Sequence, residues 1–235
     1  MLDLSRFECI SFDCYGTLID WEAGLLAALR PILERHGVVA TREQILALYG
    51  ELEPAEQRRA YRPYREILKG VVLGFGDKFG FRAAMDELES LPNSVGSWQP
   101  FPDTVEALGR LKRRYKLAII SNIDDDLFAQ TAKLLKTDFD QVITAQQAQS
   151  YKPSQNNFLL AQQRMGLAKE KWLHAAESLY HDIAPCNALG IASVWVYRRG
   201  GKIGATRDVN ARPDLHVPDL KSLADLAPTA TNISC

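Results

Sequence analysis

Five short, largely apolar segments set the main constraint on the fold of this chain. They are Phe7–Asp13, Lys116–Ser121, Gln141–Thr144, Trp172–Ala176 and Ile191–Val196. Continuous apolar runs, as opposed to alternating ones, are typical of parallel strands that are covered on both faces. Helical patterns separate the last four segments, at Asp103–Tyr115, Asp124–Leu135, Gln155–Met165 and His181–Leu189. This alternation predicts an α/β fold built on a doubly wound, parallel, Rossmann-like sheet.

Residues 20–98 interrupt the alternation of strands and helices. This stretch has helical patterns throughout, at Glu22–His36, Thr41–Leu52, Glu56–Val72 and Lys78–Leu88, with Gly37, Pro54, Gly74 and Gly76 between them. We therefore expect a core domain formed by residues 1–19 and 99–235, and an inserted α-helical cap domain formed by residues 20–98. Such a cap would cover the carboxyl ends of the strands and close a site there against water.

Composition excludes several classes of function. The chain has 235 residues and a formal net charge of −1, so it has no bulk attraction for nucleic acid or for an acidic membrane. No apolar run approaches the ~20 residues of a membrane span, and the N-terminus lacks the pattern of a secretory signal. The four cysteines have no metal-type spacing. We expect a cytoplasmic protein, as a monomer or a homodimer, with reduced thiols.

The segment Phe12–Leu18 places a carboxylate where open α/β sheets build their sites. Asp13 ends the first apolar run and precedes a turn that contains Gly16. Ligands in such folds bind at the carboxyl ends of the strands, and burial beside backbone amides can make an Asp a nucleophile. The amides of Cys14 and Tyr15 can form an anion-binding nest around it. The Thr17 hydroxyl can hydrogen-bond the carboxylate and fix its rotamer.

Polar residues follow three further predicted strands. Ser121-Asn122 ends the second strand, Lys152 follows the third, and Glu177 and Asp182 follow the fourth. The carboxyl ends of parallel strands lie at one edge of a sheet, so we expect these side chains to meet Asp13 there. An ammonium at this edge would offset the repulsion between the Asp13 carboxylate and an anionic substrate.

In order and spacing these segments resemble the four motifs of the haloacid dehalogenase (HAD) superfamily, over Phe7 to about Gly204. The resemblance implies that Asp13 is the nucleophile and that Ser121 and Asn122 bind the anionic group of the substrate. It also implies that Asp182 holds Lys152 and helps to position water.

The residue two places after the nucleophile indicates a branch of the superfamily. Phosphatases carry an Asp there, as the general acid for an alkoxide leaving group, and this chain has Tyr15. Tyr at this place resembles the 2-haloacid dehalogenases, which break a carbon–halogen bond and need no acid for the departure of halide.

Other positions depart from the dehalogenase pattern. Glu177 and Leu179 stand where those enzymes have Ser and Asn, and Phe158 stands where they have Tyr. The segments Ser121–Asp124 and Ala176–Asp182 resemble more closely the azetidine-2-carboxylate hydrolases, which open a four-membered ring at the carbon beside a carboxylate. A nitrogen leaving group must be protonated, and that need would give Glu177 a role.

The resemblance also points to two residues of the predicted cap. Trp21 stands where the first motif enters the cap and would wall the pocket. Arg58, Arg62, Arg65 and Lys69 have spacings that place them on one helix face, provided that Pro63 does not break the helix. This face is either solvated or the source of an Arg that contacts halide or carboxylate, and the register with dehalogenases points to Arg58.

The sequence therefore predicts a hydrolase that acts on small anionic carboxylic acids. Asp13 attacks the α-carbon of a 2-substituted acid to form an ester, and water then releases the 2-hydroxy acid; this route needs no metal or other cofactor. Three alternatives remain: azetidine-type C–N hydrolysis, a binding protein that has lost turnover, and a phosphatase. A phosphatase would need Mg²⁺, held by Asp13, Glu177 and Asp182.

Overall fold

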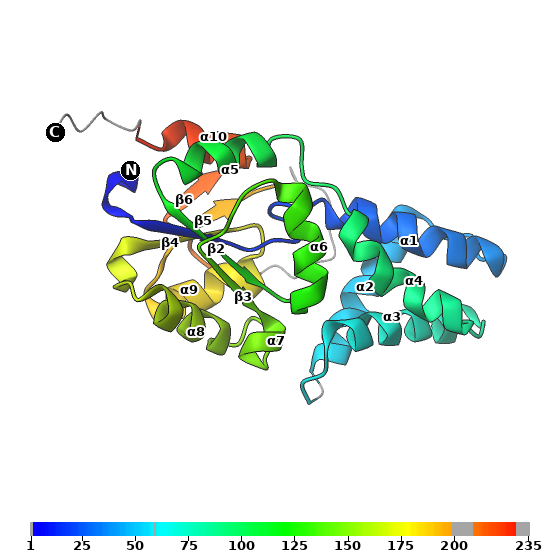
Figure 1. Ribbon diagram of the computed structural model, residues 1–235. Coiled ribbons are helices and arrows are strands. Elements are labelled where there is room, and N and C mark those ends of the chain that lie inside the picture. The colour runs from blue at the N-terminus through cyan, green and yellow to red at the C-terminus, as the bar shows by residue number, and fades with distance from the viewer. Residues whose placement is uncertain (1, 59, 199–208, 229–235) are drawn as a thin grey trace.

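The computed structural model describes residues 2–58, 60–198 and 209–228 (Figure 1). Within these residues six parallel strands form one sheet in the order β3-β2-β1-β4-β5-β6. The strands are β1 (Cys9–Phe12), β2 (Lys116–Ser121), β3 (Gln141–Thr144), β4 (Trp172–Ala176), β5 (Ala192–Val196) and β6 (Leu215–Val217). The predicted doubly wound parallel sheet is confirmed.

The sequence pattern did not predict β6. This strand has three residues and includes the exposed His216, so it presents too short an apolar run to be recognised. The other strands match the predicted segments to within two residues, and Asp13 is the residue that follows the end of β1.

Helices cover both faces of the sheet, which explains why its strands are apolar throughout. On one face α5 (Thr104–Lys112), α6 (Asp125–Leu135) and α10 (Leu220–Leu226) share a hydrophobic cluster with Leu117 and Ile119 of β2. On the other, α8 (Asn156–Met165) and α9 (Ala184–Leu189) pack with Ile120 of the same strand. Successive side chains of a strand point to opposite faces, so both must be apolar.

The shorter helical elements lie between these units. They are α7 (Ala145–Ala148), three 3₁₀ turns at Leu4–Arg6, Val95–Ser97 and Lys169–Lys171, and a π-helical turn at Leu179–Ile183 that leads into α9.

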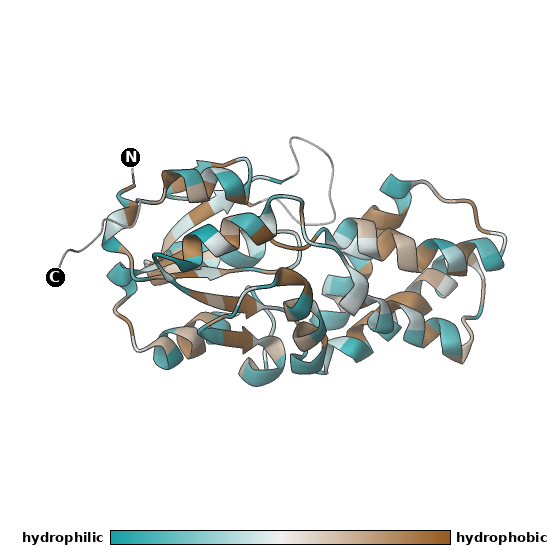
Figure 2. Cartoon of the chain, turned by 45° about the horizontal axis from the view of Figure 1, so that its top comes forward, coloured by the Kyte–Doolittle hydropathy of each residue, from teal (hydrophilic) through white to brown (hydrophobic). Residues whose placement is uncertain are grey.

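Residues 20–98 form helices and contain no strand within the described residues. The helices are α1 (Trp21–Arg35), α2 (Arg42–Gln57), α3 (Tyr64–Phe79) and α4 (Met85–Ser94), and they lie beside one end of the sheet (Figure 1). In Figure 2 these long helices carry both hydrophobic and hydrophilic residues, as expected for amphipathic helices that pack on one another. We propose that residues 20–98 are the cap domain and that 1–19 and 99–235 are the core domain.

The predicted bounds of the last three cap helices were wrong. Helix α2 runs through Pro54 to Gln57, five residues past the predicted end at Leu52. The chain is not helical at residues 60–63, and α3 then runs from Tyr64 through Gly74 and Gly76 to Phe79. These two glycines serve packing: a Cβ on Gly74 would lie 2.5 Å from the Leu52 side chain, and one on Gly76 would lie 2.6 Å from a backbone oxygen. The helix ends at Gly80, whose φ of 77° is left-handed.

Hydrogen bonds from backbone amides join the helical block to the rest of the molecule at the chain crossing and at the start of α3. Asp20 N donates to the backbone oxygen of Gln99 at 2.9 Å, so the two chain crossings lie side by side. The carboxylate of Asp124, just before α6, accepts hydrogen bonds from Tyr64 N at 2.8 Å and Arg65 N at 3.0 Å. Asp124 therefore caps the N-terminus of α3 from outside the block.

Candidate active site

The turn after β1 positions Asp13. Leu18 N and Ile19 N both donate to the backbone oxygen of Cys14, at 2.8 and 3.0 Å, and close the turn. Gly16 has a φ of 99°, and a Cβ there would lie 3.0 Å from the indole nitrogen of Trp21, so the turn requires glycine. Thr17 Oγ1 donates to Asp13 Oδ2 at 2.8 Å, which fixes the carboxylate as the sequence predicted.

Asp13 lies at the point where the strand order reverses. The chain proceeds from β1 outward through β2 and β3, and then returns to β4 on the other side of β1. Open α/β sheets bind ligands in the crevice at this switch point. Ser121 at the end of β2 and Glu177 after β4 follow the two strands that flank β1.

The ammonium of Lys152 lies at the centre of the site. Its Nζ donates to Asp13 Oδ1 at 2.9 Å, to Asp182 Oδ1 at 2.6 Å and to the backbone oxygen of Ile120 at 2.8 Å. Three acceptors satisfy the three protons of an ammonium. The Lys152 side chain is only 1% exposed, so this arrangement holds a buried cation between two carboxylates.

The surroundings shift the pKa values of Asp13 and Asp182 in opposite directions. Burial raises the pKa of Asp13, and the charge of Asp182 adds to this, so the pKa stays above its ordinary range despite Lys152. Burial acts in the same direction on Asp182, but Lys152 and a hydrogen bond from His174 outweigh it and lower the pKa of Asp182. Asp182 thus remains the fixed counter-charge, and Asp13 is the more basic and more nucleophilic carboxylate.

A buried hydrogen-bond chain supports Asp182 from behind. Trp172 Nε1 donates to Ser11 Oγ at 2.7 Å, Ser11 Oγ lies 2.7 Å from His174 Nδ1, and His174 Nε2 lies 3.0 Å from Asp182 Oδ1. The indole N–H can only donate and the ionised carboxylate can only accept. With a neutral ring, His174 therefore carries its proton on Nε2 and accepts the Ser11 hydroxyl proton at Nδ1. The chain orients Asp182, and through it Lys152.

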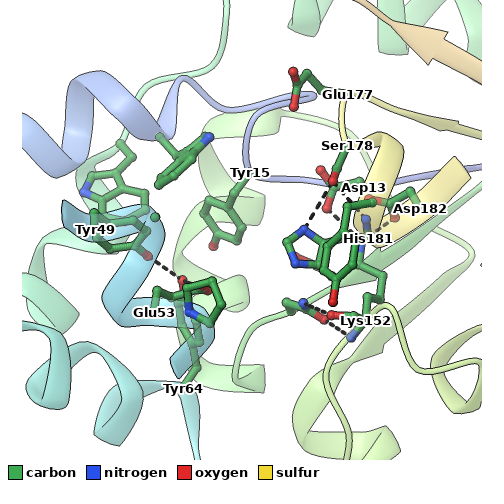
Figure 3. Close-up of a pocket in the computed structure, with 17 residues that line it drawn as sticks. Asp13, Tyr15, Tyr49, Glu53, Tyr64, Lys152, Glu177, Ser178, His181 and Asp182 are labelled. Carbon is green, nitrogen blue, oxygen red and sulfur yellow. Dashed lines mark hydrogen bonds and ion pairs between the residues drawn. The ribbon is translucent and has the colours of Figure 1, made fainter. Parts of the chain in front are cut away.

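A pocket of about 90 Å³ lies between this edge of the sheet and the helical block (Figure 3). The core lines it with Asp13, Tyr15, Ser121, Asn122, Lys152, Glu177, Ser178, Tyr180, His181 and Asp182. Residues 20–98 contribute Trp21, Tyr49, Gly50, Glu53, Pro54, Tyr64 and Trp98. A cavity of this size suits a small molecule.

Most of the residues predicted from sequence line this pocket or support it. Three of them do not line it: Thr17 and Cys14 are buried, and Arg58 is exposed. Thr17 connects the turn after β1 to the segment after β4, because its Oγ1 also accepts a hydrogen bond from Glu177 N at 2.9 Å. Cys14 contributes its backbone oxygen to the turn.

The predicted basic face of the cap is not one helix face. Arg58 is the exposed residue at the end of α2 and is not among those that line the pocket. Arg62 precedes α3 and pairs with Glu56. Arg65, on α3, pairs with Asp126. A contact between Arg58 and substrate stays a prediction that the pocket does not favour.

Ser121 and Asn122, which were both predicted to bind the substrate, differ in their hydrogen bonds. Ser121 Oγ is buried, lines the pocket and has no hydrogen-bond partner within the described residues. Asn122 instead holds the Lys152 backbone, accepting from Lys152 N at 2.7 Å and donating to its oxygen at 3.1 Å. Ser121 is thus available to a ligand, and Asn122 positions the lysine.

Tyr15 has no character of an acid. Its hydroxyl lies 2.8 Å from Thr131 Oγ1, and burial raises its pKa well above 10. The phenol therefore remains protonated at any neutral pH, which agrees with a reaction that needs no proton for its leaving group.

Four of the residues that the sequence interpretation missed carry polar groups that contact one another or Asp182. Tyr49, Glu53 and Tyr64 line the pocket from α2 and α3. Tyr49 Oη lies 3.0 Å from Tyr64 Oη, and Tyr64 Oη donates to Glu53 Oε1 at 3.3 Å. Burial raises the pKa of Glu53 to about 7. The fourth is His174, and the available signal was a titratable residue inside the apolar run Trp172–Ala176.

The described residues contain no group of three or more His, Cys, Asp or Glu side chains placed to hold a metal ion. Asp13, Glu177 and Asp182, the set that a phosphatase would use, do not form such a group. Among the residues that the structure describes, no helix is both long enough and apolar enough to span a bilayer.

Comparison with known proteins finds one matching family model and several similar sequences. Residues 7–190 match the family model of haloacid dehalogenase-like hydrolases. The chain is 31% identical over 230 residues to an (S)-2-haloacid dehalogenase of Pseudomonas putida, covering 95% of this chain and 96% of that one. It is 25% identical to a glyceraldehyde 3-phosphate phosphatase of Methanothermobacter thermautotrophicus, covering 80% and 85%.

Solved structures share the fold. The L-2-haloacid dehalogenase from Xanthobacter autotrophicus, in a structure with chloropropionic acid covalently bound, superposes with a TM-score of 0.80 at 20% identity. The superposition covers 96% of this chain and all of that one.

Proposed function

The chain belongs to the haloacid dehalogenase-like hydrolases, and on that premise we propose that it hydrolyses small 2-substituted carboxylic acids as a 2-haloacid dehalogenase does. A 2-haloacid and water become a 2-hydroxy acid and halide. One observation carries the proposal: a basic, buried Asp13 carboxylate faces a small pocket, held by Lys152 and Thr17, with Tyr15 in place of an acid.

The first step forms an ester on Asp13. A carboxylate oxygen of Asp13 attacks the α-carbon in line, the carbon–halogen bond breaks, and halide leaves with the bonding electrons. Ser121 Oγ, which has no partner within the described residues, is placed to donate to the substrate carboxylate. Lys152 stays between Asp13 and Asp182 and balances the charge when substrate enters.

The second step returns the enzyme to its first state. Water attacks the carbonyl carbon of the Asp13 ester, the acyl C–O bond breaks, and the 2-hydroxy acid and a proton are released. The ammonium of Lys152, 2.9 Å from Asp13 Oδ1, stabilises the negative charge that develops on the Asp13 oxygen. Asp182, held by His174, keeps Lys152 in place.

Glu177 favours a second candidate, azetidine-type C–N hydrolysis. This residue is 7% exposed and lines the pocket beside the turn that contains Gly16, at a position where dehalogenases are expected to have Ser. Attack by Asp13 at the α-carbon would break the ring C–N bond, and the nitrogen would leave with the bonding electrons and remain protonated. A carboxylate such as Glu177 can hold or supply that proton.

Phosphoryl transfer fits the site less well. A phosphatase would need a general acid for its alkoxide, and Tyr15 is not one; the lack of such an acid costs typically ~10²–10⁴-fold in rate. We propose that the enzyme needs neither Mg²⁺ nor another cofactor. We also propose that it acts in the cytoplasm as a monomer or homodimer, which agrees with the free, buried Cys9, Cys14 and Cys186.

A substrate panel with isotope labelling tests this function. Halide release from the two enantiomers of 2-chloropropionate, opening of azetidine-2-carboxylate, and hydrolysis of p-nitrophenyl phosphate are each measured with Mg²⁺ and with EDTA. We expect turnover of an α-substituted acid that EDTA leaves unchanged. A single turnover in ¹⁸O water should place the label in Asp13. Label that goes directly into the product would contradict the ester, and fast Mg²⁺-dependent phosphate hydrolysis would contradict the substrate class.

A further inference from the structure

We propose that Glu53 forms a cation subsite in the pocket and that the natural substrate is a small 2-substituted carboxylic acid bearing a protonated nitrogen. This inference rests on the proposed function, because it places the α-carbon of that acid at Asp13. It narrows the substrate class from carboxylates in general to zwitterions.

The charges of the pocket are the first ground. The carboxylates of Asp13, Glu53 and Asp182 line it, whereas Lys152 contributes the one ammonium among the lining residues that the structure describes. All three protons of that ammonium are already used by Asp13, Asp182 and a backbone oxygen. Lys152 therefore has no proton left for Glu53, and an anionic substrate alone would add a further negative charge.

The surroundings of Glu53 are the second ground. Glu53 lies on α2, on the side of the pocket opposite Asp13, Lys152 and Asp182 (Figure 3). Its hydrogen bonds come from two neutral groups, Gln57 Nε2 at 2.5 Å and Tyr64 Oη at 3.3 Å, and both end on Oε1. No cation among the described residues pairs with it. Burial without a counter-charge raises the pKa of Glu53 to about 7, and a bound ammonium would supply that charge.

Aromatic rings line the same pocket, and the hydroxyls of Tyr49 and Tyr64 connect to Glu53 by hydrogen bonds. Tyr49, Tyr64, Trp21 and Trp98 line it, and the rings of Trp21 and Tyr49 lie 5.2 Å apart between centroids. The faces of aromatic rings attract cations, and such rings beside a carboxylate are a common means of binding ammonium groups. An apolar side chain would gain from the rings but would leave the Glu53 carboxylate without a partner.

Ser121 is the third and independent ground. Its Oγ is buried, lines the pocket and has no hydrogen-bond partner within the described residues. A buried hydroxyl without a partner is costly, so this atom indicates where a ligand oxygen binds. The pocket thus has a donor for a carboxylate on the core side, where Asp13 also lies, and an acceptor for an ammonium on the α2 side.

Binding to a variant that cannot turn over tests the subsite. In the full chain with Asp13→Asn, titration calorimetry compares azetidine-2-carboxylate with cyclobutanecarboxylate, which has the same ring but no nitrogen. We expect the zwitterion to bind about tenfold more tightly or better. A further Glu53→Gln substitution should remove that advantage and leave cyclobutanecarboxylate unchanged or tighter. Glu51→Gln, at an exposed position of the same helix, is the matched control and should change neither.

Proton release on binding gives a second measurement. It would not depend on Glu53 if that residue had only a structural role. Near pH 7 the protonated fraction of Glu53 must lose its proton when an ammonium binds, so the binding enthalpy should depend on the ionisation enthalpy of the buffer. Glu53→Gln should abolish this dependence. The other titratable groups that line the pocket of the Asp13→Asn protein all remain in the Glu53→Gln variant, so the difference reports Glu53. They are Tyr15, Tyr49, Tyr64, Lys152, Glu177, Tyr180, His181 and Asp182.

Three outcomes would overturn the inference: equal affinity for both probes, equal weakening of both by Glu53→Gln, and no measurable binding of either probe. The proposed function is judged separately, by halide release from 2-chloropropionate with Asp13 intact. Turnover of 2-chloropropionate together with any of the three outcomes would leave the proposed function standing and reject the cation subsite.

Discussion

Replacement of Lys152 by methionine tests whether a buried cation holds the site together. The variant keeps most of the apolar stem and removes the ammonium from between Asp13 and Asp182. At N···O distances of 2.9 and 2.6 Å, the gross attraction is about 6 kcal/mol for each pair at an effective dielectric constant of ~20. Desolvation offsets much of this, so we expect the free energy of unfolding to fall by about 3–5 kcal/mol at neutral pH, as when a buried pair loses one partner.

The loss should depend on pH in a definite direction. Without Lys152 two buried carboxylates face each other, and the folded variant holds one of them protonated at a raised pKa. A carboxyl group whose pKa is raised by folding binds more protons in the folded state, so its stability falls as pH rises. The difference in the free energy of unfolding between wild type and variant should therefore be smaller at about pH 5 than at about pH 7.5. Urea denaturation at the two pH values measures it.

The surface pair of Lys112 and Asp140 provides the matched control. Its N···O distance is 2.6 Å, the same as that of Lys152 and Asp182, but its side chains are 35% and 38% exposed. Lys112→Met should cost less than about 1 kcal/mol, as exposed pairs do. If Lys152→Met costs no more than Lys112→Met, or costs the same at both pH values, the account of a buried charge balance is wrong.

Further predictions concern the groups around the nucleophile. His174→Phe removes the hydrogen bond to the Asp182 carboxylate and should lower the free energy of unfolding by about 1.5–3 kcal/mol in urea denaturation. His174→Gln keeps a donor and should lower it by less. Equal losses in the two variants would contradict the role of that hydrogen bond. The rate of ester formation should fall as pH drops through the raised pKa of Asp13, because only the ionised carboxylate attacks. Its acid limb in single-turnover kinetics should therefore lie above the ordinary 3.8, and a limb below that value would count against the burial argument. Tyr15→Phe should change turnover of a 2-haloacid by less than about tenfold, whereas a loss of ~10²-fold or more would show that the Tyr15 hydroxyl acts as an acid.

The core of the site was predictable because strand ends are visible in sequence. Asp13, Lys152 and Asp182 each follow a continuous apolar run or the turn beyond it, and the parallel sheet brings those ends together. The type of fold was predictable for a related reason. A strand such as β2 is covered on both faces, so its residues form a continuous apolar run in the sequence.

The helical side of the pocket was not predictable in the same way. Glu53 and Tyr64 meet only because α2 and α3 pack together, and that packing depends on Gly74, which a reading of local signals treats as the end of a helix. The bounds of α3 were wrong for this reason. His174 needed knowledge of the register, because only pairing with β1 shows that it faces Ser11.

The cap that Asp124 provides for α3 has a consequence for the order in which this protein folds. Asp124 comes sixty residues after Tyr64 in the chain, so a ribosome completes all four helices of the block before it makes the carboxylate that accepts the first amides of α3. During synthesis the start of α3 must rely on water until β2 and the residues before α6 emerge. The helices can form early, but α3 gains the two hydrogen bonds that Asp124 accepts only after β2 has been synthesised.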